Sequence, residues 1–295
     1  MNIGIVTVNG RDYHPNRRLL EASAARGHRV SLVHPYRSWP AVVDGRIRFA
    51  GRPVDVDLLL PRQGAEIGES SLSLLEQAVQ AGVAVVNGPA AVRLAASKYR
   101  TCRTLAEAQI PVPDTVLVNS PDAATGAAAA VGGFPAVVKP VSGRQGEGVF
   151  LAGDAGSCRR YLEAVRDLKP GVVLQRFIAP AGRKDLRIFV LGEETAAAAV
   201  MRPQNGDFRA NFHLTGRAEA AMVEEKIGQL AVSAVRALGL QIAGVDMVID
   251  DRGRPWVMEV NYSPGFEGLE AATGLDIAGA MVDYLERFWD GHTGR

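Results

Sequence analysis

Several features that mark other protein classes are scarce or missing in this chain of 295 residues. It has only two cysteines, Cys102 and Cys158, without metal-like spacing, so neither a disulfide scaffold nor a zinc site is predicted. No apolar run is long enough to span a bilayer, and the chain begins with an apolar strand, without a basic leader or cleavage site. We therefore expect a cytoplasmic protein that does not enter a membrane.

An excess of charge of one sign is also lacking. The 33 basic and 32 acidic residues nearly cancel, which argues against nucleic acid as a partner. Lysine is scarce, since it accounts for only five of the 33 basic residues. Because an ammonium group is a compact point charge that suits a single phosphate oxygen, a lysine inside an apolar segment is a candidate anion ligand.

The first part of the chain alternates between strands and helices. Apolar strands are expected over residues 2–8, 30–33, 57–60 and 83–86, helices over 16–26 and 70–81, and a small hairpin around 46–49. This alternation predicts an open α/β lobe, residues 1–94, with a largely parallel sheet. The first strand is not followed by G-x-G-x-x-G, so no dinucleotide fold is expected.

Three arginines of this lobe lie at predicted strand ends or loops, where such sheets bind ligands. They are Arg17, Arg18 and the first residue of Arg62-Gln63-Gly64. For Arg17 and Arg18, solvation at the surface is the more ordinary role.

A second lobe is expected over residues 95–178. Its predicted elements are a helix from Pro89 through Thr101, a strand over 115–118, an Ala-rich helix, a buried strand over 134–141, a helix over 159–168 and a strand over 172–178. The buried strand carries Lys139, whose ammonium would cost several kcal/mol without a counter-charge. Lys139 therefore predicts a bound anion, unless its stem carries the charge out to solvent.

The Gly-rich segment 142–148 follows this strand and precedes another predicted strand. Such a turn is typical of a flexible flap whose backbone N–H groups close over phosphates, although Gly-rich turns are also common without a ligand.

The third lobe, residues 179–295, is expected to contain a metal site. Strands are predicted over 184–190 and 195–201, a short segment over 208–213, and helices over 219–238 and 277–289. Residues 245–261 contain two alternating apolar segments that flank a cluster of turn formers, which predicts a β-hairpin. If Arg252-Gly253 is the centre of an even-numbered turn, Asp246 faces Glu259, and Asn261 shares their side.

Two carboxylates and a carboxamide on one face suit Mg²⁺, which takes one or two carboxylates and completes its shell with water and phosphates. The opposite face is expected to be core and comprises Val245, Met247, Ile249, Trp256, Met258 and Val260. An odd-length turn would separate the three polar side chains, so the prediction depends on register. An exposed polar face with fortuitous acids is the alternative.

The order of these residues resembles the ATP-grasp ligases, and within them the RimK-like group, which adds glutamate to the C-terminus of a ribosomal protein. The resemblance rests on Lys98, Lys139, the flap, Gln175–Ile178, Gly206–Asn211 and Met258–Gly268. It covers nearly the whole chain and implies a three-lobed fold of α/β and α+β lobes. Relatives in carrier-protein, pterin and deazaflavin pathways share these motifs, and Tyr262 and Phe266 depart from the usual pattern, so the substrate stays open.

The resemblance also implies roles for individual residues. ATP would lie between the second and third lobes, under the flap, and Asp246, Glu259 and Asn261 would hold two Mg²⁺ ions, with Mn²⁺ as a substitute. The implied nucleotide contacts are Lys98, Lys139, Ser142, Gly143, Gly146, Gly148, Gln175, Arg176, Phe177, Ile178, Asp185, Arg187, Arg209 and Asn211. Arg202, Arg209 and Asn211 would be catalytic, because they would stabilise the acylphosphate and the later oxyanion.

These implications favour ATP-dependent amide formation. A carboxylate attacks the γ-phosphate, ADP leaves, and an amine displaces phosphate from the acylphosphate. The partners would be a carboxylate acceptor, either a protein C-terminus or a small molecule, and an amino acid such as glutamate; a homo-oligomer is in keeping with the relatives. Two alternatives are a phosphotransferase that stops at the phosphorylated product and a nucleotide-gated binding protein.

Overall fold

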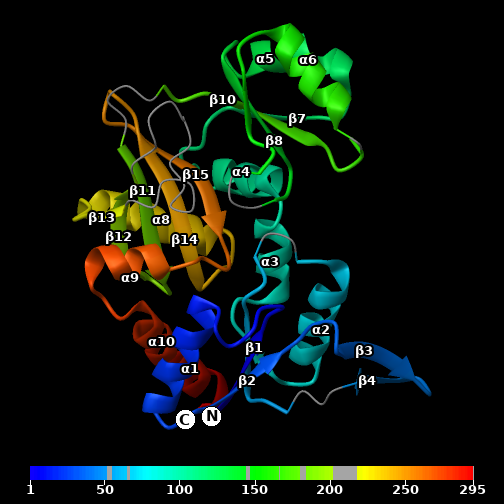
Figure 1. Ribbon diagram of the computed structural model, residues 1–295, viewed down its shortest axis with the longest axis vertical. Coiled ribbons are helices and arrows are strands. Elements are labelled where there is room, and N and C mark those ends of the chain that lie inside the picture. The colour runs from blue at the N-terminus through cyan, green and yellow to red at the C-terminus, as the bar shows by residue number, and fades with distance from the viewer. Residues whose placement is uncertain are drawn as a thin grey trace.

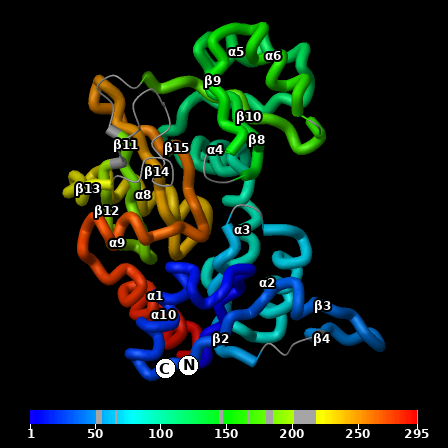
Figure 2. The backbone as a smooth tube through the Cα atoms, viewed as in Figure 1, coloured from blue at the N-terminus to red at the C-terminus, as the bar shows by residue number. Residues whose placement is uncertain are grey.

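The computed structural model describes residues 1–51, 55–64, 67–143, 147–165, 167–179, 184–201 and 218–294. These residues form three separate sheets of four or five strands and one two-stranded hairpin. The N-terminal sheet lies at one end of the molecule, the second sheet lies at the other, and the third lies between them to one side (Figure 1). Both chain termini lie beside the N-terminal sheet (Figure 2). No helix in the described ranges is long and apolar enough to cross a membrane.

The N-terminal sheet is parallel, with the strand order β2-β1-β5-β6, as the alternation of strands and helices predicts. Its elements are β1 (Asn2–Val6), α1 (His14–Ala25), β2 (Arg29–Val33), β5 (Leu58–Pro61), α2 (Glu69–Gln80) and β6 (Ala84–Val85). The predicted small hairpin is confirmed as β3 (Ser38–Val43) and β4 (Arg46–Gly51). The central strands β1 and β5 are buried, which explains their continuous apolar sequences.

The single helix predicted from Pro89 through Thr101 is wrong. Helix α3 (Pro89–Ala95) ends, and α4 (Lys98–Glu107) begins after Ser97, whose hydroxyl accepts a hydrogen bond from the Arg100 amide. Serine is a favoured N-cap because its oxygen satisfies an amide that has no partner within the helix. The break places Lys98 at the first position of α4.

The second sheet is antiparallel, with the strand order β7-β10-β8-β9. Its elements are β7 (Thr115–Val118), the short helix η1 (Pro121–Ala123), α5 (Ala124–Ala130), β8 (Ala136–Pro140), β9 (Phe150–Ala152), α6 (Ala155–Ala164) and β10 (Val172–Arg176). The pairing of β8 with β9 confirms that strands flank the Gly-rich segment. Helix α6 begins earlier than predicted, because Asp154 and Ser157 form a capping box that fixes its start.

The third sheet is antiparallel, with the strand order β13-β12-β11-β14-β15. Its elements are β11 (Lys184–Leu191), β12 (Glu194–Met201), β13 (Ala218–Ala220), α8 (Glu225–Ala237), β14 (Ile242–Ile249), β15 (Pro255–Asn261), α9 (Glu267–Thr273) and α10 (Ile277–Thr293). The predicted helix over 219–238 is wrong at its start, because residues 218–220 pair with β12 and this pairing overrides alanine's helix preference. Helix α9 was not predicted. The segment predicted over 208–213 lies outside the described residues.

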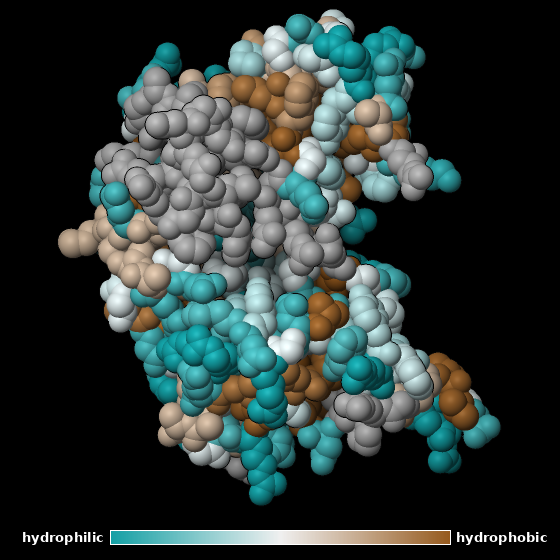
Figure 3. All heavy atoms as spheres, in the orientation of Figure 1, coloured by the Kyte–Doolittle hydropathy of each residue, from teal (hydrophilic) through white to brown (hydrophobic). Residues whose placement is uncertain are grey.

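The N-terminal and third sheets share a core, whereas the second sheet has its own. One apolar cluster joins Ile3 and Leu58 of the first sheet to Phe189 of the third. The cluster under the second sheet contains only residues between 116 and 174. The space-filling view shows a notch between the second-sheet end and the N-terminal end of the molecule (Figure 3). The second lobe is thus the part that is packed least against the rest.

Candidate active site

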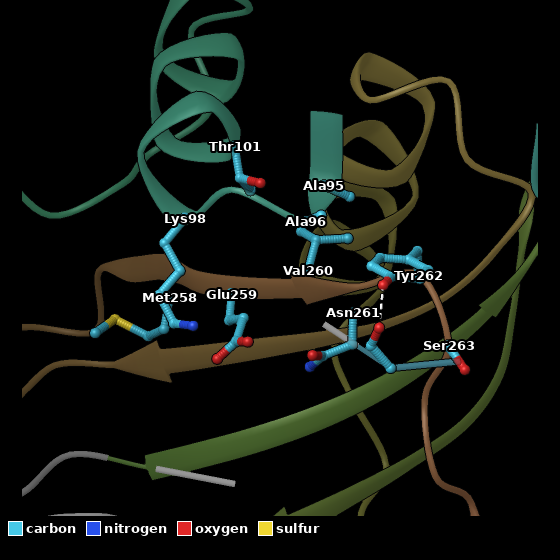
Figure 4. A pocket seen from close by; sticks show the side chains of 11 residues that line it. Ala95, Ala96, Lys98, Thr101, Met258, Glu259, Val260, Asn261, Tyr262 and Ser263 are labelled. Atoms are coloured by element: carbon cyan, nitrogen blue, oxygen red, sulfur yellow. Dashed lines mark hydrogen bonds between the residues drawn. The ribbon is translucent and has the colours of Figure 1, made fainter. Parts of the chain in front are cut away.

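The hairpin of β14 and β15 brings its two acids together as predicted, with Asp246 opposite Glu259. Asn261 lies opposite Gly244 in the same register, and its amide nitrogen lies 3.5 Å from a carboxylate oxygen of Asp246. The side chains of Glu259 and Asn261 extend from the same side of β15 (Figure 4). We call Asp246, Glu259 and Asn261 the oxygen face.

The turn of this hairpin is nevertheless odd-numbered. On the turn side Val248 pairs with Trp256 and Ile249 with Pro255, so residues 250–254 form the turn. The register shifts by one between Asp246 and Met247, which makes the hairpin bulged at this point. The bulge compensates for the odd turn, so the oxygen face converges although the predicted even turn is wrong.

The bulge also changes the predicted core face. Val257 pairs with Met247 and is 1% exposed, whereas Trp256 and Met258 are only partly buried. The expectation that Trp256 and Met258 belong to the core is therefore wrong, because one extra residue reverses the alternation between the turn and the bulge. Val245, Met247 and Val260 are buried, and Ile249 packs on the same core from its edge.

Asp246 is held by Arg187, which lies opposite it on β11. The Arg187 guanidinium donates two hydrogen bonds of 2.6 Å, one to each carboxylate oxygen of Asp246. Burial lowers the pKa of Arg187, but the carboxylates of Asp246 and Glu259 outweigh this effect and raise it. Arg187 thus orients Asp246, a predicted metal ligand. Asp185, a predicted nucleotide contact, lies two residues before Arg187 on β11 and on the same face of the strand.

Lys139 is 8% exposed and lies on β8, and its ammonium donates a hydrogen bond of 2.9 Å to the side-chain carbonyl of Gln175. The Gln175 amide in turn donates to the Thr115 hydroxyl at 2.9 Å. Burial lowers the pKa of Lys139, and the negative charge of Glu259 opposes this effect. No ion pair to Lys139 occurs among the residues that the structure describes, so the site suits an incoming anion.

The structure shows which groups hold the Gln175 side chain, while its nucleotide contact stays a prediction. Gln175 is 1% exposed. Thr115 holds the Gln175 amide, so that the side-chain carbonyl of Gln175 faces the ammonium of Lys139. Sequence reasoning missed Thr115, because nothing in a short apolar strand distinguishes one threonine as the support of a distant amide.

Lys98 connects α4 to the start of the flap. Its ammonium donates to the Gly143 carbonyl at 3.0 Å, and its backbone amide donates to the Val141 carbonyl at 2.8 Å. Gly148, at the other end, has φ +67°, and a Cβ there would lie 2.9 Å from the Pro140 ring. Both the conformation and the close approach require glycine. Ser142 adjoins Gly143 at the start of the flap. Gly146 lies outside the described residues.

A pocket joins these parts of the chain. Its lining includes Gly64 from the N-terminal lobe, Lys98 and Thr101 from α4, and Glu259 and Asn261 from β15. The side chain of Lys98 extends from α4 toward the strand that carries Glu259 (Figure 4). Within the described ranges, Glu259 has neither a hydrogen bond nor an ion pair. A free carboxylate beside a carboxamide and a second, oriented carboxylate is a donor set that fits Mg²⁺.

The remaining predicted contacts follow β10 or lie outside the described residues. Arg176 is exposed and lies 3.4 Å from Asp114, while Ile178 is 8% exposed and Phe177 partly buried. Arg202, Arg209 and Asn211 fall in the segment 202–217, which the structure does not describe. Their catalytic roles stay predictions.

Comparisons with known proteins agree with this geometry. Residues 95–285 match the family described as the RimK-like ATP-grasp domain, and residues 1–92 match the RimK PreATP-grasp domain. The chain is 38% identical over 290 residues to a probable alpha-L-glutamate ligase of Pseudoalteromonas translucida (strain TAC 125), covering 97% of this chain and 96% of that protein. It is 39% identical over 290 residues to a probable alpha-L-glutamate ligase of Xanthomonas oryzae pv. oryzae (strain MAFF 311018), covering 97% and 98%.

Two solved structures are also similar. The RimK domain protein ATP-grasp from Sphaerobacter thermophilus DSM 20745 has a TM-score of 0.75 and 27% identity, covering 97% of this chain and 100% of that chain. The ATP-grasp ligase PsnB, solved in complex with a minimal precursor, has a TM-score of 0.73 and 22% identity, covering 97% and 98%. The similarity to PsnB, at 22% identity, is a similarity of fold.

Proposed function

We propose that this chain, which belongs to the RimK-like ATP-grasp ligase family, joins a carboxylate to the amine of an amino acid. Glutamate is the first candidate for this amino acid. As a member of this family it is an ATP-dependent carboxylate–amine ligase. The observation that carries the proposal is the convergence of Asp246, Glu259 and Asn261 beside a pocket that also contains Lys98. The acceptor would be a protein C-terminus or a small-molecule carboxylate.

The oxygen face would hold the metal ions of the reaction. Asp246, Glu259 and Asn261 would hold Mg²⁺, which would supply positive charge to neutralise the phosphates of ATP during phosphoryl transfer. We assign two ions, with Glu259 shared between them, and expect Mn²⁺ to replace Mg²⁺ at the same oxygen ligands. Arg187 supports this assignment, because its two hydrogen bonds fix the orientation of Asp246 before any ligand arrives.

The two lysines would bind the phosphates. Lys139 is buried and lacks an anionic hydrogen-bond partner among the described residues, so a phosphate oxygen would supply the missing counter-charge. Lys98 is bound to the carbonyl of Gly143, at the start of the flap. If Lys98 exchanges this carbonyl for a phosphate, nucleotide binding and movement of the flap become coupled.

The flap, Gln175–Ile178 and Asp185 would complete the nucleotide site. We keep Ser142, Gly143, Gly146 and Gly148 as the flap contacts, and Arg202, Arg209 and Asn211 as the clamp on the acylphosphate. A closed flap would exclude water from the acylphosphate, so that an amine rather than water receives the acyl group.

We also propose three lobes, with boundaries at 1–94, 95–178 and 179–295. The three sheets, each lying within one of these ranges, support this division. Use of ATP fits a cytoplasmic enzyme. Sedimentation of the purified protein would determine whether it is a homo-oligomer.

ADP release separates this proposal from the alternatives. The full chain is incubated with ATP, Mg²⁺ and an acceptor carboxylate, first without and then with a mixture of amino acids, and products are identified by mass spectrometry. A ligase releases ADP continuously only when both substrates are present, and the acceptor gains one amino-acid residue. Continuous release with the carboxylate alone would identify a phosphotransferase, and no continuous release would identify a binding protein.

A further inference from the structure

Arg62 is a buried cation without a carboxylate partner. It follows β5 and is 5% exposed, and its guanidinium donates one hydrogen bond of 2.7 Å, to the carbonyl of Pro264. The same group lies over the ring of Phe266, 5.7 Å from its centroid. Its Nε atom has no hydrogen-bond partner, and no ion pair to Arg62 exists in the described part of the chain.

Burial changes the acidity of this group without removing its charge. It lowers the pKa of Arg62 to about 10, and the phenol of Tyr13 opposes this effect weakly. At neutral pH the guanidinium is therefore still protonated. Most buried charges in proteins are paired, because an unpaired one loses its hydration without a replacement. An anion that reached Arg62 would supply that replacement.

Two other buried polar atoms, on residues near Arg62, also lack a hydrogen-bond partner among the described residues. Gln63 is 7% exposed, and its side-chain carbonyl oxygen has no hydrogen bond. His14 packs edge-on against Phe266, with 5.7 Å between ring centroids, and its Nδ1 atom is buried without a partner. Buried polar groups are rarely left unsatisfied. Arg62 and His14 both contact the ring of Phe266, and together with Gln63, the neighbour of Arg62 in the chain, they form a built polar site.

This polar site adjoins the candidate active site. Gly64, two residues after Arg62, lines the pocket that contains Glu259 and Asn261. The Tyr262 hydroxyl donates to the Gly64 carbonyl, and Arg62 binds the carbonyl of Pro264, three residues beyond Asn261. The loop after β5 is therefore attached to the chain that leaves the oxygen face. It also lies at the carboxyl end of a parallel strand, where α/β sheets bind ligands.

We infer that Arg62 binds a substrate carboxylate that is not phosphorylated, in the first place a carboxylate of the incoming amino acid. The inference rests on the proposed ligase function. The carboxylate that reacts must reach the γ-phosphate at the oxygen face, whereas Arg62 is fixed to Pro264 beyond the end of β15. A guanidinium suits a carboxylate because it offers parallel N–H donors, and the Nε–H of Arg62 is free for this contact. A second carboxylate of the acceptor has the same chemistry.

The test compares Arg62→Met with the wild-type chain under initial-rate conditions. We expect the KM for L-glutamate to rise roughly 10- to 100-fold, as for the loss of a charged hydrogen bond, with the KM for ATP unchanged. Arg62→Lys keeps the charge and is expected to show a smaller rise. The matched control is Arg26→Gln, since Arg26 joins the end of α1 to Asp283 of α10 by a hydrogen bond of 3.1 Å, outside the pocket.

The source of the carboxylate is distinguished by the substrate whose KM changes. A rise for glutamate, together with equal use of glutamate and its α- or γ-amide by Arg62→Met, assigns the site to the amino acid. A rise for the acceptor instead assigns it to the acceptor's second carboxylate. If neither KM changes by more than that of Arg26→Gln, or if Arg62→Met only lowers the melting temperature, the inference is overturned.

Direct binding keeps this inference separate from the proposed function. Calorimetric titration of the full chain with L-glutamate, with ADP and Mg²⁺ present, measures the contact without turnover. Wild-type binding that Arg62→Met weakens supports the site even if no product forms, and equal binding by both rejects the amino acid as the source of the carboxylate. A wild-type chain that forms no amide with any amino acid would reject the ligase function by itself.

Discussion

Two arginines of this protein, the buried Arg62 and the partly buried Arg187, differ in how their charge is balanced. Arg187 forms a two-bond ion pair with Asp246, and carboxylates raise its pKa despite burial. Arg62 has one backbone carbonyl and an aromatic ring, and burial lowers its pKa to about 10. The fold completes the first site by itself and leaves the second without a counter-charge among its described residues. The first therefore has the features of a structural support for ligands, and the second those of a ligand site.

The same distinction separates the two acids of the hairpin. Asp246 is oriented by Arg187, whereas Glu259 has no hydrogen-bond or ion-pair partner in the described ranges and lines the pocket. Lys139 resembles Arg62, since in the described part of the chain its ammonium is bound by the neutral side chain of Gln175 alone. Arg62, Lys139 and Glu259 have no opposite charge at hydrogen-bond distance within the described ranges, and we assign a ligand to each of them.

The largest effect on stability and turnover is expected when Arg187 loses its partner Asp246. Asp246→Ala leaves Arg187 buried and unpaired, which should destabilise the fold by about 3 kcal/mol, the lower end of the range for broken buried pairs, because the pair is partly exposed. Turnover should fall by roughly 10²–10³, as for the loss of a transition-state contact. Urea unfolding and ADP release measure the two effects.

A double variant separates stability from function in this pair. Arg187→Met combined with Asp246→Leu removes both charges, so the free energy of unfolding should return to within about 1 kcal/mol of wild type. Activity should stay low, because the oxygen face has lost a ligand. Restored activity in the double variant would show that Asp246 serves only the ion pair.

Gln175→Leu should have an intermediate effect. It removes the one hydrogen-bond partner that the Lys139 ammonium has among the described residues, so we expect a loss of roughly 1–3 kcal/mol in unfolding free energy. Because nucleotide phosphates would pair with Lys139, saturating ATP and Mg²⁺ should recover part of that loss. Thermal denaturation with and without nucleotide measures this recovery, and an equal nucleotide-induced shift in wild type and variant would contradict it.

Arg62→Met should change stability by no more than about 1 kcal/mol in either direction. The variant loses one hydrogen bond to Pro264 but also removes an unpaired buried charge, and these effects have opposite signs. Urea unfolding checks this prediction beside Asp246→Ala. If the free energy of unfolding fell as far as in Asp246→Ala, the charge of Arg62 would be stabilised by groups of the protein itself.

The smallest effect concerns the hairpin turn. Burial would raise the pKa of Asp250, but hydrogen bonds from the amides of Arg254 and Arg252 and the indole of Trp256 hold it at about 2. Since the unfolded pKa is about 3.9, the ionised carboxylate stabilises the fold fully above that pH. The stability is lost as the pH falls toward 2. The melting temperature of Asp250→Asn should thus lie a few degrees below wild type at pH 6, and the difference should shrink in acid.

The sequence predicted the elements whose signals are local and the pairing of the acids, but not the details of register. Asp246 and Glu259 could be placed opposite each other from the turn formers between them. The position of the bulge could not be predicted, because Trp256, Val257 and Met258 are all apolar and alternation does not reveal which one is buried. The break at Ser97 was hidden by the helix-forming residues around it. Arg62 could be placed at a strand end, but its burial depends on Pro264 and Phe266, some 200 residues later.

The most direct test of the oxygen face is metal binding by Glu259→Gln. Electron paramagnetic resonance measures free Mn²⁺ during titration of the full chain that is saturated with a non-hydrolysable ATP analogue. The wild-type chain should take up Mn²⁺, and Glu259→Gln should bind it roughly tenfold or more weakly, with an unchanged melting temperature in the absence of metal. Equal Mn²⁺ affinity in the two proteins would contradict the assignment of Asp246, Glu259 and Asn261 as the metal site.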